Sequence, residues 1–363
     1  MHIDIIAGAR PNFMKIAPLV AAIRQAKEQG ENINYRLIHT GQHYDKKLSE
    51  TFFDQLNIPK PDINLEVGSG TQAGQTANVM IKYEAVLTDS KPDLVLVVGD
   101  VNSTMACAIV AKKMGIKVAH VEAGIRSRDW SMPEEVNRVV TDAITDYFFT
   151  TTAGAGDNLR KAGVPSEAIF LVGNTMIDTL LKNLPNLKQP DFWEEHKLEE
   201  NRYVVCTLHR PNNVDDAEGL STMIHEIGRS TNQLPVVFPV HPRTRKSLRS
   251  DDLPSNIVLT EPLGYLEFIY LVKHAKVVVT DSGGIQEETT VLGIPCITLR
   301  DNTERPETVE VGTNELIGTN PERIKPAFDT LFAGQWKPGK VPDHWDGKAG
   351  KRIVHHISAL FAE

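Results

Sequence analysis

Short apolar segments rich in β-branched residues alternate with longer segments of helical character along this chain, and the alternation occurs twice. In the first half, strands are expected at 3–7, 35–39, 94–98, 117–121, 147–151 and 169–172, and helices at 16–28, 73–87 and 106–114. In the second half, strands are expected at 203–207, 236–240, 257–259, 277–280 and 296–299, and helices at 217–230 and 265–274. Because strands that alternate with helices form parallel sheets, the pattern predicts two doubly wound α/β domains.

A polar segment with two prolines separates the two halves. It covers residues 184–191 and is typical of a linker. The chain has 363 residues, which is more than one hydrophobic core usually serves. We therefore predict an N-terminal domain at 1–180 and a C-terminal domain at 181–347. A final helix at 348–363 can belong to either half, and packing of this helix against the first domain is one of the two possibilities.

The composition limits the possible classes of function. Hydrophobic residues make up 41% of the chain and charged residues 24%, as in ordinary globular proteins. The net charge of −8 includes no basic block, which argues against nucleic-acid binding, and no apolar run approaches the length of a membrane span. Cys107, Cys206 and Cys296 fit neither disulfide nor metal spacing and suit a reducing compartment. No signal peptide is visible, so we expect a cytoplasmic protein.

The segment 276–295 reads as a strand, a glycine turn and a helix. Glycines at a helix N-terminus let backbone N–H groups approach an anion, and the helix dipole adds partial positive charge there. A diphosphate fits the three turn residues, Ser282, Gly283 and Gly284. Glu287 or Glu288, one turn later, is placed to bind a ribose. A tight turn with a helix N-cap explains the same residues, so this short motif alone does not decide between the two.

Acidic residues follow the predicted strands of the first half. Asp100 and Glu122 each come after an apolar strand, and Glu134 lies in the first turn of a predicted helix. Ligands of open α/β sheets bind at the carboxyl ends of the strands, so we expect these groups on one rim. Clustered carboxylates raise each other's pKa values, which suits proton abstraction near neutral pH. Taken singly, each has a structural explanation, such as a helix N-cap at Asp100 or a favourable helix dipole at Glu134.

Basic residues near the first two strands suggest contacts to phosphate. Arg10 and Lys15 follow the first strand within the predicted turn 8–15, and the planar guanidinium of an arginine suits a phosphate group. Two solvated cations in a turn between strand and helix explain the same residues equally well. After the second strand, Gln42 and His43 lie in a glycine turn, which is suggestive of binding without defining it.

The second half places further basic groups after its strands. His209 and Arg210 follow one strand, and such a pair can bind or protonate a departing phosphate. His241 follows the next strand, and Arg305 lies in a charged segment after the last one. Phe268, on a predicted helix, offers an aromatic face to a planar base, whereas core packing is the better explanation for the neighbouring Tyr265.

Two kinds of site find no support in the sequence. The histidines and carboxylates show no clear arrangement of metal ligands in the sequence. A Gly-x-Gly-x-x-Gly motif is also absent, so a nicotinamide cofactor is not indicated.

Taken together, these motifs resemble the UDP-N-acetylglucosamine 2-epimerases of the non-hydrolysing type. The resemblance runs in order through 8–15, 41–43, 99–100, 120–126, 133–138, 209–210, 281–288 and 303–307. It implies a GT-B fold, with two Rossmann-like domains and a cleft between them. It also implies a cytoplasmic homodimer that binds a UDP-sugar and needs no metal or redox cofactor. The implied reaction interconverts UDP-GlcNAc and UDP-ManNAc by anti-elimination of UDP to a 2-acetamidoglucal and re-addition, which supplies precursors of cell-surface polysaccharides.

The motifs and the resemblance together give a set of site residues. Four are expected to be catalytic: Asp100, Glu122, Glu134 and His209. The others are expected to bind the substrate: Arg10, Lys15, Gln42, His43, Arg138, Arg210, His241, Phe268, Ser282, Gly283, Gly284, Glu288 and Arg305. Which carboxylate removes the proton from C2 stays open.

The chain also departs from the commonest bacterial members of that family. It has Ala9 and Asn12 where they have threonine and glutamate. The Gly-Ala-Arg-Pro opening at 8–11 is shared with relatives that act on UDP-2,3-diacetamido-glucuronic acid. Three alternatives therefore stay open: a 2-epimerase of that sugar, a hydrolysing UDP-GlcNAc 2-epimerase, and a GT-B glycosyltransferase.

Overall fold

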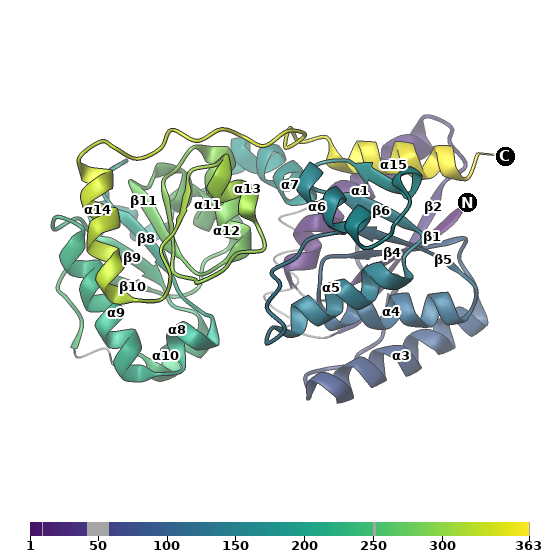
Figure 1. Ribbon diagram of the computed structural model, residues 1–363, viewed down its shortest axis with the longest axis horizontal. Helices are drawn as coiled ribbons and strands as arrows, with labels where there is room; N and C mark the ends of the chain where they lie inside the picture. The colour runs from purple at the N-terminus through teal and green to yellow at the C-terminus, as the bar shows by residue number, and fades with distance from the viewer. Residues whose placement is uncertain (9, 42–57, 250–251, 363) are drawn as a thin grey trace. The chain divides into compact units, whose positions relative to one another are not determined.

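The computed structural model describes residues 1–8, 10–41, 58–249 and 252–362, with the side chains of residues 10 and 11 left out. The chain divides into two compact units. The first unit contains Met1–Lys182 and Asp343–Glu363, and the second contains Asn183–Pro342. Each unit has a parallel sheet with helices packed against it (Figure 1).

The described part of the first unit contains a seven-stranded sheet in the order β3-β2-β1-β4-β5-β6-β7, and all its strand pairs are parallel. The strands are β1 (His2–Ala7), β2 (Asn34–His39), β3 (Ile63–Asn64), β4 (Leu94–Val98), β5 (Lys117–Val121), β6 (Tyr147–Thr150) and β7 (Ile169–Leu171). The helices are α1 (Arg10–Glu28), α3 (Gln72–Asp89), α4 (Asn102–Lys113), α5 (Pro133–Ile144), α6 (Ala153–Lys161), α7 (Thr175–Asn183) and α15 (Ala349–Leu360).

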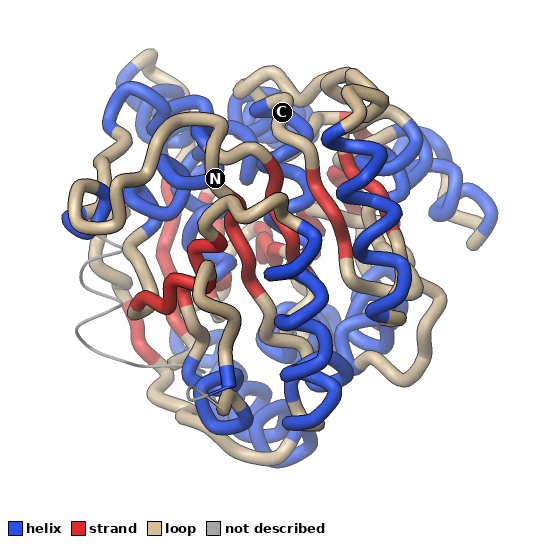
Figure 2. Tube along the Cα trace, turned by 90° about the vertical axis from the view of Figure 1, so that its left-hand side faces the viewer, coloured by secondary structure: helices blue, strands red, loops and turns tan. Residues whose placement is uncertain are grey.

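The described part of the second unit contains a six-stranded parallel sheet in the order β10-β9-β8-β11-β12-β13. The strands are β8 (Val204–Thr207), β9 (Val236–Pro239), β10 (Ile257–Thr260), β11 (Val277–Thr280), β12 (Cys296–Thr298) and β13 (Asn314–Leu316). The helices are α8 (Pro211–Val214), α9 (Ala217–Ser230), α10 (Pro242–Ser247), α11 (Tyr265–His274), α12 (Gly283–Leu292), α13 (Pro306–Glu310) and α14 (Ile324–Phe332). Figure 2 shows the strands of the two sheets in red among the helices in blue.

Both sheets reverse their strand order at the middle of the sheet. The reversal lies between β1 and β4 in the first unit and between β8 and β11 in the second. In open α/β sheets, the loops that follow the strands diverge at such a point and leave room for a ligand. Each unit therefore has one preferred place for a site, at the carboxyl ends of its two central strands.

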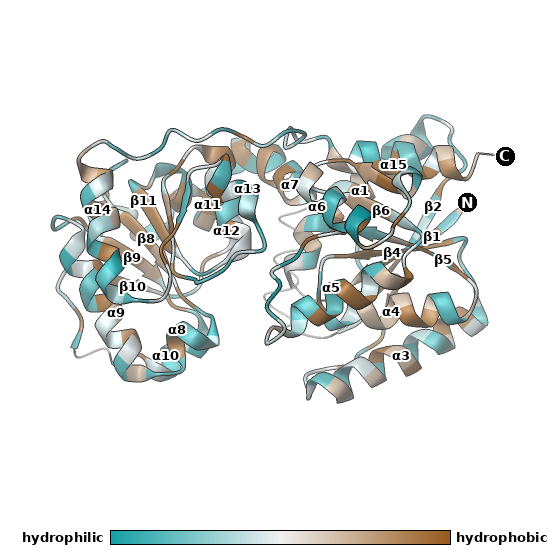
Figure 3. Ribbon diagram, viewed as in Figure 1, coloured by the Kyte–Doolittle hydropathy of each residue, from teal (hydrophilic) through white to brown (hydrophobic). Residues whose placement is uncertain are grey.

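The apolar strands predicted from the sequence form the cores of both units (Figure 3). Every residue of β4 is buried, as expected for a strand covered on both faces. In β8, Val204 and Cys206 pack in one cluster with apolar residues of α9 and α14, whereas Val205 packs in another cluster with residues of α11. Since successive side chains of a strand point to opposite faces, helices cover both faces of this sheet.

The structure corrects three sequence expectations. Helix α1 begins at Arg10, so Lys15 lies on a helix and not in the predicted turn 8–15. The structure also contains β3 and β13, which were not predicted. Val101, and not Asp100, is the N-cap residue of α4. Strands β3 and β13 are only two and three residues long, which is too short for a periodic sequence signal.

The C-terminal helix α15 packs against α1 within the first unit (Figure 1). Asp178 of α7 holds its N-terminus, because its carboxylate accepts the backbone N–H groups of Ala349 at 3.0 Å and Gly350 at 2.7 Å. No helix in the described part of the chain is both long and apolar enough to span a bilayer.

Candidate active site

Glu122 lies at the carboxyl end of β5 in an unusual backbone conformation. Its φ is +72°, in the left-handed region that residues other than glycine seldom adopt. Its Oε2 accepts a hydrogen bond from Lys15 Nζ of α1 at 2.7 Å, and both side chains are buried. Strained backbone of this kind concentrates at functional sites, where the surrounding structure holds it in place.

Asp100 lies in the loop after β4 and is held by Arg138 of α5. Arg138 donates to Asp100 Oδ2 from Nη2 at 2.6 Å and from Nε at 3.1 Å. Asn137 of the same helix donates to the Asp100 carbonyl at 2.9 Å. The Asp100 side chain is 28% exposed and that of Arg138 is 4% exposed. The buried Arg138 therefore holds the Asp100 carboxylate through one of its oxygens, and part of the carboxylate stays accessible to a ligand.

The two neighbouring glutamates at the start of α5 differ in their surroundings. Glu134 is exposed in the first turn, whereas Glu135 is buried. Glu135 accepts hydrogen bonds from the backbone N–H groups of Ser127 and Arg128 and from Arg138 Nη1 at 2.6 Å. Burial raises the pKa of Glu135, but these hydrogen bonds together hold it below its ordinary value. Sequence reasoning missed Glu135, whose role is to brace Arg138.

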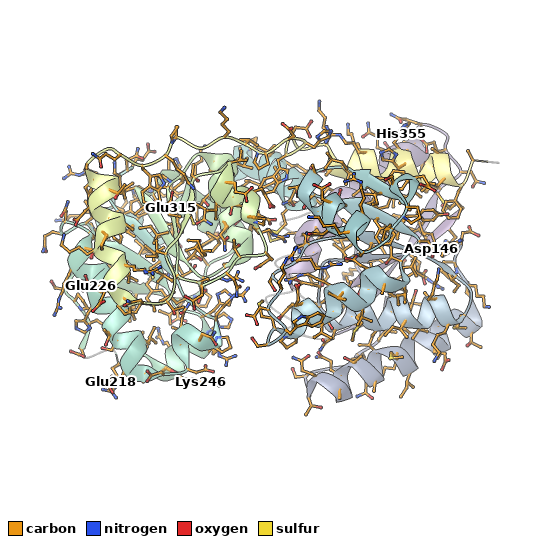
Figure 4. The ribbon with its side chains drawn as sticks, in the orientation of Figure 1. Asp146, Glu218, Glu226, Lys246, Glu315 and His355 are labelled. Atoms are coloured by element: carbon orange, nitrogen blue, oxygen red, sulfur yellow. The ribbon has the colours of Figure 1, made fainter. Side chains whose placement is uncertain are left out.

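Carboxylates elsewhere in the first unit show what an ordinary structural ion pair looks like. Asp146, labelled in Figure 4, precedes β6 and so lies at the opposite, amino end of the sheet. It accepts from Lys112 at 2.7 Å and from Lys117 at 3.1 Å, and both lysine side chains are exposed. At Asp100 and Glu122, in contrast, the cation is buried.

His209, at the carboxyl end of β8, is held by a buried carboxylate. Its Nδ1 lies 2.8 Å from Asp281 Oδ1, and Asp281 is completely buried after β11. Asp281 Oδ2 also accepts the backbone N–H groups of His209 at 3.0 Å and Arg210 at 2.9 Å. Burial raises the pKa of Asp281, but His209 and these hydrogen bonds lower it below its ordinary value. The carboxylate of Asp281 orients the His209 ring through Nδ1. Because the His209 side chain is 42% exposed, the ring is also accessible to a ligand.

Four predicted site residues share one pocket in the second unit. The pocket has a volume of about 190 Å³ and is lined by Thr207, Leu208, His209, Pro239, His241, Pro262, Leu263, Phe268, Ser282 and Ile285. The rings of His209 and His241 lie 6.0 Å apart, and the backbone N–H of Arg243 donates to His241 Nδ1. A mostly apolar wall with a few polar groups is typical of a pocket for a small organic ligand.

The N-terminus of α12 lies among arginines. Ser282 is its N-cap residue, but its side chain makes no capping hydrogen bond. Glu304 lies beside the helix start, bonded to Arg300 Nη2 at 2.6 Å and 3.7 Å from Arg210 Nη2. Burial raises the pKa of Glu304, but the surrounding arginines lower it well below its ordinary value. Arginines and a helix N-terminus together favour an anion at this place.

The two glutamates of α12 point into the protein. Glu287 is completely buried, and its Oε1 lies 2.6 Å from Arg305 Nε. Glu288 is buried and accepts a hydrogen bond from the hydroxyl of Tyr265 at 3.1 Å. Burial raises the pKa of Glu288 to about 8, and the Glu287 carboxylate adds to this effect while Tyr265 opposes it. Tyr265 is buried, as expected for core packing, and in addition positions Glu288.

The remaining predicted residues are only partly described. Gln42 and His43 lie outside the described residues, and Arg10 is placed only by its backbone, at the start of α1. Within the described ranges, no group of three His, Cys, Asp or Glu side chains is arranged to hold a metal ion. Sequence reasoning did not select Asp281, although its position directly after a buried strand is the same signal that selected Asp100 and Glu122.

Comparisons with known proteins agree with one another. A family model described as UDP-N-acetylglucosamine 2-epimerase matches residues 25–358. The chain is 44% identical to UDP-N-acetylglucosamine 2-epimerase of Methanocaldococcus jannaschii, over 99% of each protein. It is 38% identical to UDP-2,3-diacetamido-2,3-dideoxy-D-glucuronate 2-epimerase of Pseudomonas aeruginosa, over 99% of this chain and 100% of that protein.

A solved structure gives the same result. The crystal structure of the M. jannaschii UDP-GlcNAc 2-epimerase in complex with UDP-GlcNAc and UDP matches with a TM-score of 0.88 at 43% identity. The match covers 99% of this chain and 100% of that chain.

Proposed function

The chain belongs to the UDP-N-acetylglucosamine 2-epimerase family, and from this premise we propose that it interconverts UDP-GlcNAc and UDP-ManNAc by inverting C2 of the sugar. Its relatives match over nearly their whole length. The expected GT-B fold, with two Rossmann-like parallel-sheet units, is confirmed.

The observation that carries this proposal is the pair of carboxylates on adjacent strands of the first sheet. Asp100 follows β4 and Glu122 follows β5, and these strands are direct neighbours. Each carboxylate has its own buried cation, Arg138 or Lys15. Inverting a carbon requires removal of a proton from one face and delivery to the other. Two separately held carboxylates suit these two tasks.

We assign the steps as follows. One carboxylate takes the proton from C2, and the C1–O bond breaks with its electron pair passing to the phosphate oxygen of UDP. The bound 2-acetamidoglucal then receives a proton on the other face of C2, and UDP adds back to C1. Glu134 joins Asp100 and Glu122 in this catalytic set. His209, Arg210 and the N-terminus of α12 stabilise the charge that develops on departing UDP.

The remaining substrate contacts are proposed from the same resemblance. Phe268 and His241 line the pocket that would receive the uracil, and Glu288 would bind the ribose. Arg10, Lys15, Gln42, His43, Arg138 and Arg305 complete the substrate-binding set. We further propose that the enzyme works in the cytoplasm as a homodimer and supplies precursors of cell-surface polysaccharides.

A second substrate has specific support. The relative that acts on UDP-2,3-diacetamido-2,3-dideoxy-D-glucuronate is 38% identical over the whole chain. The reaction at C2 would be the same, and the sugar would carry an additional amide and a carboxylate. This alternative changes the substrate and leaves the roles of Asp100, Glu122 and His209 unchanged.

Proton NMR of UDP-GlcNAc incubated with the pure protein in D₂O tests the proposal. We expect UDP-ManNAc to appear and deuterium to replace the C2 proton in both sugars. Free N-acetylmannosamine with UDP would assign the protein to the hydrolysing relatives instead. If UDP-GlcNAc is unchanged, the same experiment with the diacetamido-glucuronate sugar distinguishes the second substrate from a glycosyltransferase.

A further inference from the structure

His120 of β5 is completely buried and connects two elements beside the candidate active site. Its Nε2 lies 2.8 Å from the carbonyl oxygen of Gly99, the residue before Asp100. Its Nδ1 lies 2.7 Å from Asp142 Oδ1 of α5. A carbonyl oxygen is only an acceptor, so Nε2 must carry the hydrogen of the first bond. His120 therefore holds the loop after β4 through its backbone.

Asp142 extends the same contact to the loop after β5. Its second oxygen, Oδ2, accepts the backbone N–H of Gly124 at 3.0 Å and lies 2.6 Å from Arg126 Nη1. Burial raises the pKa of Asp142, but His120 and Arg126 hold it below its ordinary value. The buried pair of His120 and Asp142 thus connects the loop that carries Asp100 to the loop that carries Glu122.

Both loops have a backbone that needs such support. Gly99, Glu122 and Gly124 all have φ between +71° and +79°, in the left-handed region. The loops also have little free space. A Cβ atom on Gly99 would lie 3.2 Å from Lys15 Nζ, and one on Gly124 would lie 2.2 Å from the carbonyl oxygen of Ala155. The contacts of His120 and Asp142 are made to the two glycines that flank the carboxylates along the chain.

We propose that His120 and Asp142 are positioning residues that fix Asp100 and Glu122 relative to each other. This inference rests on the proposed function, because it assumes that these two carboxylates act on the substrate. His120 and Asp142 are themselves buried, so they act through the two loops. A displacement of about 1 Å in a catalytic group can cost about a hundredfold in rate, so loosening either loop slows the reaction.

The alternative is that this buried pair stabilises the fold and does nothing more. The two possibilities differ in what a substitution changes. A stabilising pair affects the fraction of folded protein and leaves kcat of the folded enzyme intact. A positioning pair affects kcat of fully folded enzyme and leaves UDP binding by the second unit unchanged.

Two substitutions of the same histidine separate its two contacts. In His120→Gln, the amide nitrogen replaces Nε2 and keeps a donor for the Gly99 carbonyl. In His120→Asn, the shorter amide replaces Nδ1 and keeps only the contact to Asp142. We expect His120→Asn and Asp142→Asn to lower kcat by about a hundredfold with an unchanged Kd for UDP. His120→Gln keeps the bond to the Gly99 carbonyl but breaks the link at Asp142, so it should lower kcat to a similar extent.

Tyr83→Phe is the matched control. The Tyr83 hydroxyl is also buried in the first unit and donates to Asp4 at 3.0 Å, in the middle of β1. Its loss should lower the unfolding temperature and leave kcat unchanged. The inference is overturned if His120→Asn keeps wild-type kcat, or if kcat follows unfolding temperature equally in the His120 variants and in Tyr83→Phe.

Hydrogen exchange of backbone amides tests this inference without any substrate, so its result does not depend on the proposed function. The amide of Gly99 donates to the Val121 carbonyl at 3.0 Å, and the amide of Gly124 donates to Asp142. If the wild-type protein turns over neither UDP-sugar, the proposed function fails, and these amides then decide the inference. Faster exchange of the Gly99 amide in His120→Asn and of the Gly124 amide in Asp142→Asn, with neither change in Tyr83→Phe, supports it, and unchanged exchange overturns it.

Discussion

The two units of this protein have the same strand order at their centres but carry opposite chemistry at their strand ends. In the Asp100–Arg138 pair of the first unit, the cation is buried and the carboxylate is the more exposed partner, at 4% for Arg138 against 28% for Asp100. In the second unit the carboxylate is buried and the cationic partner is exposed, at 0% for Asp281 against 42% for His209. The first unit therefore presents a proton acceptor, and the second presents a group that can stabilise an anion.

This difference shows how one architecture is adapted to two tasks. The sheet order places a loop at the same position in both units, and the residues that follow each strand decide the chemistry. In the Asp100–Arg138 and His209–Asp281 pairs, the partner that keeps contact with solvent is the one we assign to the reaction.

Asp100→Asn and Glu122→Gln should each lower kcat by about a hundredfold or more, because each removes a proton-transfer group. The affinity for UDP should change little, since the predicted UDP contacts of the second unit are intact. Steady-state turnover and calorimetric titration with UDP measure the two effects. Asp146→Asn is the control, because its carboxylate pairs with exposed lysines at the amino end of the sheet. Near-normal turnover in either variant removes that residue from the catalytic set.

Asp281→Asn should lower turnover by an amount similar to His209→Asn, about a hundredfold, because the histidine loses the group that orients it. The double variant should be little worse than either single variant, since residues that act as a unit are not additive. Rate measurements on the three variants test this. Additive losses would show that Asp281 and His209 act separately.

Gly283→Ala should weaken UDP binding by about tenfold, which is about 1.4 kcal/mol. The reason is steric, because the new Cβ would lie 2.5 Å from Glu304 Oε1 and would displace this buried carboxylate beside the arginines. Gly154→Ala is a matched control in the first turn of α6, where the new Cβ would be 4.0 Å from its nearest neighbour. Equal UDP affinity in the two variants would contradict the anion site at α12.

Glu288→Gln should change how stability depends on pH. The pKa of Glu288 is about 8 in the folded protein and 4.5 ordinarily, so the folded state binds its proton more tightly. Stability is therefore lost as pH rises from about 4.5 to about 8, by up to about 1.4 kcal/mol per pH unit, with no further loss above pH 8. Glutamine removes this contribution, so the variant should gain stability relative to wild type as pH rises.

Chemical denaturation at several pH values measures this effect. Glu261→Gln serves as the control, because Glu261 is an exposed carboxyl of the same unit, and its substitution should leave the pH dependence unchanged. If wild type and Glu288→Gln show parallel pH profiles, Glu288 does not stay protonated in the folded state.

Much of the fold and part of the candidate site can be predicted from local sequence patterns. The strand at 94–98 and the helix at 217–230 were predicted with the bounds that the structure shows, since both have strong hydrophobic patterns. Asp100, Glu122 and His209 were recognisable because each follows an apolar strand. Glu135 was not recognisable from the sequence, because its neighbour Glu134 has the same local sequence signal and only packing distinguishes the two residues.

Two parallel sheets and the residue types at their strand ends can be derived from the sequence alone, because periodicity and order along the chain are local properties. The partners of those residues depend on the tertiary fold. Lys15 of α1 meets Glu122 across 107 positions. His209 meets Asp281 across 72 positions, because the parallel pairing of β8 and β11 brings their carboxyl ends to one edge. In the Asp100–Arg138 and His209–Asp281 pairs, the fold also buries one partner and leaves the other to meet a ligand.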